Sequence, residues 1–393
     1  DCDFFAGCEK PIQNITNYLK ITKKYNVTFV YRYSEKYADD IKDMTFDAAI
    51  RPILIPDPNS LIRKVNQDSS IFLLFKVCIR TIEKFQIFNL IYFFKQLQIL
   101  VKEKPDIVHI NNGGFPGAES CRMMAITSGF MRVNKIIFTV NNMAVPARGI
   151  IDKFIDYFVN IFVDNFVTAS DAASAQFQNI RRIGVGKTQS IPNAVLNDEI
   201  LINHNAALRE EFNIADDTLL IGSAGLLIDR KGYDILIKAA NLITKDINWC
   251  IYVFGDGQQR EKLEKMIQEY NLQDRFFLPG FRENIHSYIN DLDIFTLSST
   301  GTEDMPNAIN EAMLIGKPIV GTKTSGVPEQ VDHGINGFLV NQGDYVDLAK
   351  KLEYLLKLDP NELEKIGKES NKKYTNSFSY NLAMNKYLMI YDS

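Results

Sequence analysis

The chain has 393 residues, 46% of them hydrophobic and 23% charged, which is typical of a folded protein with two to three domains and argues against a largely disordered chain. Its net charge of −4 conceals an asymmetry, because residues 1–198 hold 24 Lys and Arg against 19 Asp and Glu, whereas the remainder holds 20 against 29. Five cysteines without disulfide or metal spacing indicate a reduced, intracellular protein, and no apolar run is long enough to predict a membrane-spanning helix.

Strands and helices are predicted to alternate along the first half of the chain. Short apolar runs bounded by polar or turn residues predict buried strands at 26–33, 106–111, 135–141, 165–170 and 187–195. Apolar residues at helical spacing predict a helix at 148–162. This alternation is typical of a parallel α/β sheet.

The second half restarts the same pattern. Strands are predicted at 219–225, 249–257, 275–280, 293–299, 318–322 and 337–340. Helices are predicted at 233–243, 258–272 and, near the end, 379–391. We therefore expect two doubly wound domains, at 1–197 and 198–376, with a cleft between them, and a C-terminal helix within 377–393 that packs back on the first domain.

One segment of the first half, residues 61–104, is both apolar and basic, with eight Lys and Arg against three Asp and Glu. Two interpretations stay open. The segment is either a pair of packed helices with solvated edges or an amphipathic surface that rests on anionic lipid headgroups.

Two carboxylates flank the start of a predicted helix in "TGTEDMPNAINEAMLIGKPIVG", residues 300–321. Glu303 precedes the helix, Glu311 lies about one turn inside it, and the free N–H groups around Pro306 and Asn307 face the same strand-end opening. Helix-start amides favour a phosphate, and carboxylates accept hydrogen bonds from sugar hydroxyls. A sugar joined through a diphosphate to a nucleoside carries these groups in that order. Taken singly, each glutamate could equally be an ordinary helix-start or surface residue.

The same stretch resembles the E-x7-E signature of retaining GT-B glycosyltransferases, in particular family 4 (the group 1 type). Similar runs surround it: "GLLIDRKGYDILIKAA", "VFGDG", "DLDIFTLSS" and "GVPEQVDHGINGFLV" in the second half, and "FVTASD" and "IPNAV" in the first. The resemblance implies the GT-B architecture: two Rossmann-like domains, an interdomain cleft and a C-terminal helix that crosses back to the first domain.

The resemblance also implies roles for individual residues. Glu303 would contact the donor sugar and support its developing positive charge, Lys231 and its neighbour Arg230 would neutralise the diphosphate leaving group, and Glu311 would hold the ribose. The further residues expected around the donor are Met305, Pro306, Asn307, Gly225 and Gly255. No metal and no cofactor is implied, and a UDP-sugar is expected as donor in preference to a GDP-sugar.

The sequence departs from the family at several places. Leu226 stands where the family often has an Arg after Gly225, and Asn141 and Asn142 stand where it often has a His. The loop "DFFAGCEKP", with Gly7, resembles the family's first loop, but most of the strand that should precede it is absent. Together with His109, expected at a strand end, these residues (Gly7, Asn141 and Asn142) are the acceptor-side candidates.

Two local motifs suggest other chemistry. "DLD" at 291–293 fits a metal–nucleotide pattern of a different glycosyltransferase fold, but its place before a buried strand favours a structural role. "GDGQQR" begins like a dinucleotide fingerprint, but Arg260 occupies the position of the third glycine. No basic and aromatic groove for nucleic acid is apparent.

The sequence therefore predicts a metal-independent retaining hexosyltransferase that acts on a saccharide or lipid-linked acceptor in cell-surface polysaccharide or lipopolysaccharide synthesis. We expect it in the cytoplasm, at the inner face of the cell membrane if residues 61–104 contact lipid. Two alternatives stay open: a nucleotide-sugar epimerase of the same two-domain plan, and a non-catalytic nucleotide-sugar or lipid-binding module.

Overall fold

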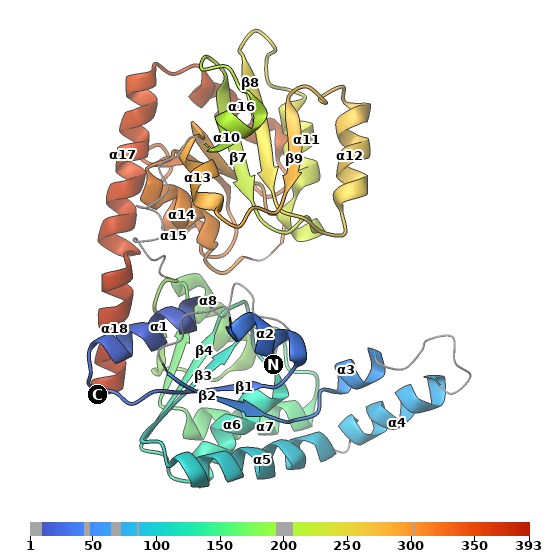
Figure 1. Ribbon diagram of the computed structural model, residues 1–393, viewed down its shortest axis with the longest axis vertical. Coiled ribbons are helices and arrows are strands. Elements are labelled where there is room, and N and C mark those ends of the chain that lie inside the picture. Colours follow the sequence, from blue (N-terminus) through green and yellow to red (C-terminus); the bar gives the residue numbers. More distant parts are fainter. Residues whose placement is uncertain (1–9, 43–47, 64–71, 85, 194–206, 302) are drawn as a thin grey trace. The chain divides into compact units, whose positions relative to one another are not determined.

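The computed structural model describes residues 10–42, 48–63, 72–84, 86–193, 207–301 and 303–393; Gly7 lies outside the described residues. The chain forms two compact units, which we call unit 1 (residues 1–191 with 384–393) and unit 2 (residues 192–383). Both are built from parallel strands covered by helices (Figure 1).

Unit 1 contains the elements from the first half of the chain. In chain order they are α1 (Lys10–Ile21), β1 (Thr28–Arg32), α2 (Glu35–Lys42), β2 (Ala49–Ile53), α3 (Pro58–Arg63), α4 (Phe72–Lys84), α5 (Ile87–Glu103), β3 (Ile107–Asn112), α6 (Glu119–Phe130), β4 (Lys135–Val140), α7 (Ile150–Phe162), β5 (Asn165–Thr168), α8 (Asp171–Arg181) and β6 (Thr188–Ser190). The strands β3, β4, β5 and β6 form one parallel sheet in that order. Its two middle strands are almost entirely buried, because helices cover both faces.

A second, two-stranded parallel sheet in unit 1 pairs β1 with β2. The sequence analysis did not predict β2, whose run "AIRPI" is interrupted by Pro52. Proline has no N–H for a sheet ladder and is therefore confined to edges and strand ends, so its presence weakens the strand signal. In the structure β2 is indeed an edge strand that pairs only with β1 among the described strands.

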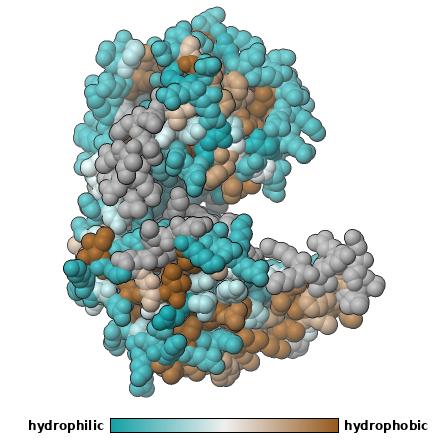
Figure 2. All heavy atoms as spheres, viewed as in Figure 1, coloured by the Kyte–Doolittle hydropathy of each residue, from teal (hydrophilic) through white to brown (hydrophobic). Residues whose placement is uncertain are grey.

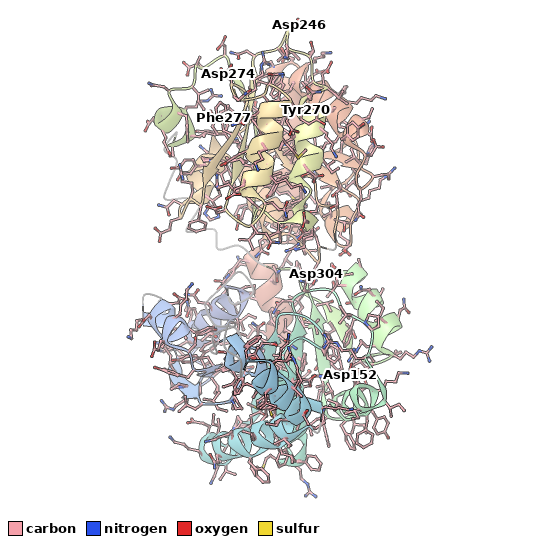
Figure 3. All side chains as sticks on the ribbon, turned by 90° about the vertical axis from the view of Figure 1, so that its right-hand side faces the viewer. Asp152, Asp246, Tyr270, Asp274, Phe277 and Asp304 are labelled. Carbon is pink, nitrogen blue, oxygen red and sulfur yellow. The ribbon has the colours of Figure 1, made fainter. Side chains whose placement is uncertain are left out.

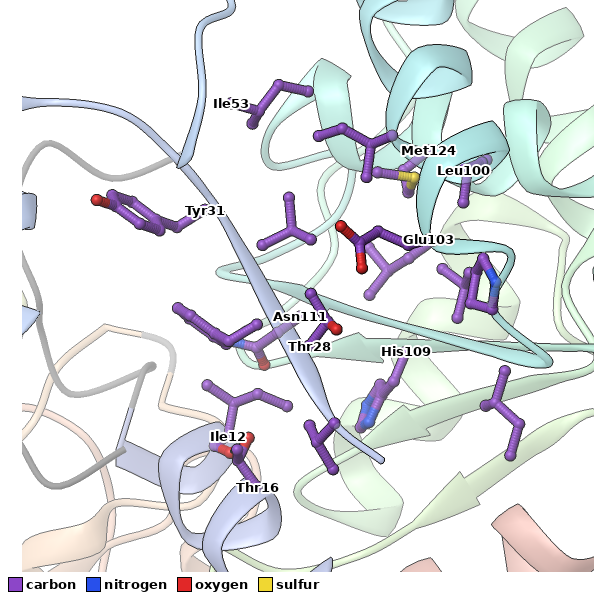
Figure 4. A pocket seen from close by; sticks show the side chains of 18 of the residues that line it. Ile12, Thr16, Thr28, Tyr31, Ile53, Leu100, Glu103, His109, Asn111 and Met124 are labelled. Atoms are coloured by element: carbon purple, nitrogen blue, oxygen red, sulfur yellow. The ribbon is translucent and has the colours of Figure 1, made fainter. Parts of the chain in front are cut away.

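A cavity of about 710 Å³ lies between the two sheets of unit 1. One wall is β1 and the other is β3, and the side chains that line it come also from α1, α5 and α6 (Figure 4). Thr28 and Tyr31 of β1 and His109 and Asn111 of β3 are among them. The facing edges of β1 and β3 do not pair with each other.

Unit 2 contains the remaining elements. In chain order they are α10 (Ala207–Phe212), β7 (Leu219–Ala224), the 3₁₀ turn η1 (Asp229–Lys231), α11 (Tyr233–Ala240), β8 (Trp249–Phe254), α12 (Arg260–Glu269), β9 (Phe276–Gly280), α13 (Ile285–Asn290), β10 (Ile294–Leu297), α14 (Asn307–Ile315), β11 (Ile319–Thr322), α15 (Val327–Gln330), β12 (Gly337–Val340), α16 (Tyr345–Leu356) and α17 (Pro360–Ser377).

The sheet of unit 2 has six parallel strands in the order β12-β11-β10-β7-β8-β9. The chain runs outward from β7 to β9 and then returns to place β10 on the other side of β7. In open parallel sheets, ligands bind at the carboxyl ends of the two strands where the order reverses. In unit 2 these strands are β7 and β10.

The last helix, α18 (Tyr380–Asp392), starts at the end of unit 2, and residues 384–393 belong to unit 1. Its Tyr391 hydroxyl lies 2.5 Å from Nδ1 of His109, and Ser393 accepts a hydrogen bond from Lys135 at 2.7 Å. The prediction that the C-terminal helix crosses back to the first domain is therefore confirmed. Among the described helices, none combines the length and the apolar character needed to cross a bilayer.

Candidate functional site

The loops that follow β7 and β10 carry the predicted catalytic residues. Gly225 directly follows β7, Arg230 and Lys231 form η1 beyond it, and Glu303 follows β10. Figure 3 labels Asp304, the neighbour of Glu303, at the end of unit 2 opposite to Asp246 and Asp274, which precede strands. The candidate site therefore lies at the carboxyl edge of the sheet, where its strand order reverses.

Backbone hydrogen bonds fasten the loop after β10 onto η1. The amides of Thr300 and Gly301 both donate to the carbonyl of Arg230, at 2.9 and 3.1 Å, and the Ser298 hydroxyl donates to the carbonyl of Lys231 at 3.1 Å. This close approach requires Gly232, which has φ +63° and whose missing Cβ would lie 2.2 Å from the Ser298 carbonyl oxygen. Any other residue there would push the two loops apart.

Glu303 is the centre of the site. Its Oε1 accepts hydrogen bonds from Arg230 Nη1 at 2.6 Å and from the Ser299 hydroxyl at 2.9 Å, and forms an ion pair with Lys231 Nζ at 2.8 Å. Its Oε2 accepts no hydrogen bond from any residue that the structure describes. One carboxylate oxygen is thus fixed by three donors, whereas no described residue donates to the other.

The electrostatics keep Glu303 ionised although it is only 6% exposed. Burial by itself raises the pKa of this carboxyl. The positive charge of Lys231, the Arg230 guanidinium and the Ser299 hydroxyl outweigh that effect and hold the pKa below its ordinary value. At neutral pH Glu303 is therefore a carboxylate in contact with two cations.

The floor of the site is backbone. Gly255, at φ +138°, ends β8 beside Gly225, and a Cβ on Gly255 would lie 2.0 Å from the Gly225 carbonyl oxygen. The ammonium of Lys231 lies over Gly225, with Nζ 3.7 Å from the position of a Cβ there. The structure thus brings Gly225, Gly255, Lys231 and Glu303 together.

The start of α14 borders Glu303. Met305 and Pro306 are buried, Pro306 precedes the first helical residue, and Asn307 is that residue. The side-chain oxygen of Asn307 is buried and has no hydrogen-bond partner in the described chain. Such an oxygen is costly to bury alone, so it is well placed to accept a hydrogen bond from a bound ligand.

Gln330 fixes the position of this helix start, a role that the sequence analysis missed. The side chain is fully buried, and its Nε2 donates to the carbonyl of Pro306 at 3.1 Å and to Oδ1 of Asn310 at 2.7 Å. Gln330 belongs to the run "GVPEQVDHGINGFLV", which carried the resemblance but no assigned role. Gln330 therefore stands in a recognisable run of the sequence, but only the structure shows that it holds the start of α14.

Glu311 lies in the second turn of α14, as predicted, and has a neighbour that the sequence does not reveal. Its Oε1 lies 3.7 Å from Nε2 of His286, at the start of α13. Both side chains are mostly buried, and Nε2 of His286 has no hydrogen-bond partner among the described residues. His286 is thus placed to orient the second carboxylate.

The "DLD" pair has the structural role predicted for it. Oδ2 of Asp293 accepts a hydrogen bond from the amide of Leu220 at 2.7 Å. Oδ2 of Asp291 accepts from the amides of Leu208 and Arg209 at 2.8 and 3.1 Å. Their carboxylates thus join β10 and α13 to β7 and α10. Among the described residues no group of three or more His, Cys, Asp or Glu side chains is arranged to hold a metal ion.

The acceptor-side candidates lie in unit 1. The Asn141 side chain donates to Oδ1 of Asn111 at 2.7 Å and to the carbonyl of Asn112 at 3.0 Å, which joins the ends of β3 and β4. Asn142 is exposed, and its Oδ1 accepts from the amide of Met143 at 2.8 Å. Asn141 thus shapes the strand ends of unit 1, whereas Asn142 presents its side chain to solvent.

His109 does not end its strand, contrary to the expectation from the sequence. It is the third residue of β3, which continues to Asn112 because the polar pair after Ile110 still pairs with β4. Its ring nitrogens lie 2.5 Å from the Tyr391 hydroxyl and 2.7 Å from the Thr139 hydroxyl. Burial lowers the pKa of His109 to about 4. Because its ring nitrogens lie within hydrogen-bond distance of residues of β4 and α18, His109 has a structural role in joining these elements.

Comparison with known proteins finds a family match in the second half of the chain. Residues 205–373 match the family of glycosyl transferases group 1. The amylovoran biosynthesis glycosyltransferase AmsK of Erwinia amylovora is 32% identical over 168 residues, 39% of this chain and 40% of that protein. The lipopolysaccharide core biosynthesis glycosyltransferase LpsD of Rhizobium meliloti is 27% identical over 184 residues, 47% and 52% of the two chains. The chain thus matches about half, or less, of the length of these relatives.

Nearly the whole chain resembles solved structures in its fold. HepE of Anabaena, solved in complex with UDP, superposes with a TM-score of 0.75 at 18% identity, covering 98% of this chain and 96% of that one. Sucrose-phosphate synthase of Thermosynechococcus elongatus gives 0.75 at 16% identity, covering 98% and 93%. The predicted GT-B fold, with two Rossmann-like domains, is confirmed.

Proposed function

We propose that this protein is a metal-independent, retaining glycosyltransferase that transfers a hexose from a nucleotide diphosphate sugar to an acceptor hydroxyl. The observation that carries the proposal is Glu303, one oxygen of which contacts both Lys231 and Arg230. This is an arrangement for binding a sugar and a diphosphate next to each other. The retaining mechanism rests on the resemblance of Glu303 and Glu311 to the E-x7-E signature.

In the transfer step, the bond between C1 of the sugar and the terminal phosphate oxygen breaks, and the acceptor oxygen forms a new bond to C1. The acceptor proton passes to the departing phosphate, so that a nucleoside diphosphate is released. Positive charge develops on the sugar ring and negative charge on the phosphates. Glu303 stabilises the first, and Lys231, Arg230 and the N–H groups at the start of α14 stabilise the second.

The remaining donor residues position the substrate. Glu311, oriented by His286, is placed to accept hydrogen bonds from the ribose hydroxyls, and Asn307 offers a buried acceptor near the helix start. Gly225 and Gly255 allow the diphosphate to approach the backbone because they have no side chains. The UDP complex of the Anabaena protein supports a uridine nucleotide in preference to a guanosine nucleotide.

We further propose that the acceptor is a saccharide, either free or lipid-linked, in cell-surface polysaccharide or lipopolysaccharide synthesis. The named functions of AmsK and LpsD support this setting. A lipid-linked acceptor would place the protein at the cytoplasmic face of the membrane, with residues 61–104 as the contact. The exposed Leu73, Leu74 and Val77 of α4 and Leu90 of α5 support that contact.

A panel of nucleotide sugars tests the proposed reaction. The melting temperature of the protein should rise with UDP and with one UDP-sugar, and UDP should be released when a suitable saccharide is added. Lys231→Ala should reduce both responses, while Lys265→Ala, at an exposed site on α12, should leave them unchanged.

The outcomes also separate the alternatives. An epimerase would convert the nucleotide sugar without releasing UDP, and a binding module would show the thermal shift without either product. A thermal response that is indifferent to both Lys231→Ala and Glu303→Ala would contradict the proposed site.

A further inference from the structure

A continuous row of aromatic rings crosses the outer surface of three neighbouring helices of unit 1. Along the row, successive ring centroids are 5.6, 5.9, 5.4, 6.2 and 4.9 Å apart. The row, which we call the aromatic ridge, consists of Phe94, Phe93, Phe130, Phe162, Phe158 and Phe154. It begins on α5, passes the end of α6 and finishes on α7, and α6 contacts both other helices.

Three rings of the ridge pack against the core of unit 1, and the other three are exposed to solvent. Phe93, Phe158 and Phe162 are half-buried against the core of unit 1, whereas Phe94, Phe130 and Phe154 are each about 60% exposed. Single exposed apolar residues are ordinary on protein surfaces, but a contiguous row across three helices is not. Figure 2 shows further hydrophobic surface gathered over α4 and α5, and Ile150 and Ile151 lengthen the exposed face at the start of α7.

Each of the three exposed rings has a cation within two residues of it. Lys95 follows Phe94, Arg132 follows Phe130 by two positions, and Lys153 precedes Phe154. All three cations are exposed, and none makes an ion pair with any residue that the structure describes. Their charge is therefore available to an external partner.

The acidic residues of the same helices are all occupied by arginines. On α5 Glu103 pairs with Arg51, and on α6 Glu119 pairs with Arg122. On α7 Asp152 and Asp156 are turned inward to Arg122 and Arg181. The part of unit 1 formed by these three helices and their ends consequently presents apolar rings and positive charge to solvent.

We infer that the aromatic ridge is a docking surface for an anionic lipid bilayer. Aromatic rings are favoured at the boundary between headgroups and acyl chains, and each lysine or arginine near an anionic surface adds to the attraction. A second copy of the chain fits less well, because a symmetric contact through the same face would bring like charges together.

The ridge extends the proposed membrane contact beyond residues 61–104 to α6 and α7. The link between this surface and a lipid-linked acceptor rests on the proposed function. The binding to lipid does not, since the rings and cations belong to unit 1 and the proposed donor site belongs to unit 2.

Sedimentation with vesicles tests the inference on the full chain. We expect binding to vesicles of phosphatidylcholine with about one third phosphatidylglycerol at low salt, weak binding to phosphatidylcholine alone, and release at about 0.5 M salt. The double variant Phe94→Ser/Phe154→Ser and the double variant Lys95→Glu/Lys153→Glu should each lower the partition coefficient by about tenfold or more. Phe281→Ser and Lys265→Glu, the same changes at exposed sites of unit 2, should bind like the unchanged chain.

Two further measurements make the result decisive. Unchanged melting temperatures show that the ridge variants fold, and an unchanged thermal response to UDP shows that the donor site is intact. Absence of binding to anionic vesicles, or binding that neither double variant weakens, overturns the inference. Lipid binding without any response to nucleotides would instead contradict the proposed function and leave the ridge assignment in place.

Discussion

Glu303 forms ion pairs with both Lys231 and Arg230, the two cations that the proposed diphosphate would require. Lys231 Nζ and Arg230 Nη1 both lie within 2.8 Å of the same carboxylate oxygen. A diphosphate bound as proposed would compete with this oxygen for the two side chains. The proposed function therefore couples binding of the donor to release of the Glu303 carboxylate from its two cations.

This coupling predicts opposite effects of one substitution on affinity and rate. Glu303→Gln removes the negative charge but keeps the size of the side chain, so a carboxylate no longer competes with the phosphates for Lys231 and Arg230. The affinity for UDP should rise severalfold, while kcat should fall by about 10²–10³ because the developing charge on the sugar loses its support. Calorimetric titration with UDP and initial rates measure the two quantities. Glu264→Gln, on the exposed side of α12, is the control, and weaker UDP binding by Glu303→Gln would contradict the coupling.

His109 makes the stability of unit 1 depend on pH. Burial lowers its folded pKa to about 4, below the ordinary value of about 6.5, so the unfolded chain binds more protons between these values. The stabilisation is complete above pH 6.5 and is lost as the pH falls toward 4. Between pH 7 and pH 5 the free energy of unfolding should fall by about 2 kcal/mol through this group. Denaturant unfolding of the wild type and His109→Gln checks this, since the variant should lack that part of the decrease.

The sequence alone indicates the candidate site residues but not their bonds. Glu303, Lys231 and Gly225 stand in runs that resemble a known family, and the resemblance implies their roles. That Arg230 and Lys231 share one oxygen of Glu303, that Gln330 holds the start of α14, and that His286 approaches Glu311 depend on loops separated by 20 residues or more. No local pattern encodes these contacts.

Among the elements, α6, α7 and α8 are joined by a buried ion network. Arg122 lies 2.5 Å from Asp152, labelled in Figure 3, and 2.8 Å from Asp156, and Arg181 approaches both carboxylates. Burial favours the neutral form of Asp152, but the Arg148 amide and the two guanidinium groups outweigh it and lower its pKa. Because all partners are present, the network can be buried without an unpaired charge.

Removing one carboxylate from this network should therefore be costly. Asp156→Ala leaves Arg122 and Arg181 buried with too few partners, and we expect the free energy of unfolding of unit 1 to fall by about 3–5 kcal/mol. Asp106→Ala, at an exposed site of the same unit, should change it by less than about 0.5 kcal/mol. Chemical denaturation followed by circular dichroism compares the two variants, and equal stabilities would show that the network contributes nothing.

Strands and helices are well predicted where the hydrophobic residues follow a single pattern along the sequence. The strands β3, β4, β7 and β8 read as apolar runs because parallel sheets bury both faces. Strand β2 is missed because Pro52 and the exposed Arg51 interrupt its pattern at a sheet edge. A pair of packed helices is one of the two interpretations that the sequence leaves open for 61–104. The ridge is not predicted, since its rings come from three helices that only the fold brings together.

On the scale of the whole molecule, two separate cores predict two unfolding transitions. The cluster around Trp249, Leu236 and Ile251 lies within unit 2, and the cluster around Phe138, Phe166 and Val159 lies within unit 1. In calorimetry of the intact chain, UDP at 100 times its Kd should stabilise one transition by about 2.7 kcal/mol and leave the other nearly unchanged. Lys231→Ala should weaken this selective shift, and Lys265→Ala should not. A uniform shift of both transitions would show that the nucleotide contacts both units.

The cavity between β1 and β3 has a consequence for the behaviour of the protein in concentrated solution. Among the described strands, none pairs with the edges of β1 and β3 that face each other across about 710 Å³, and a five-residue strand would occupy roughly 800 Å³ in such a place. An extended apolar peptide that enters this cavity can form backbone hydrogen bonds with both strand edges at once. We therefore expect slow self-association in which copies of the chain exchange strands. Peptides that fill the cavity should stabilise the protein against this association.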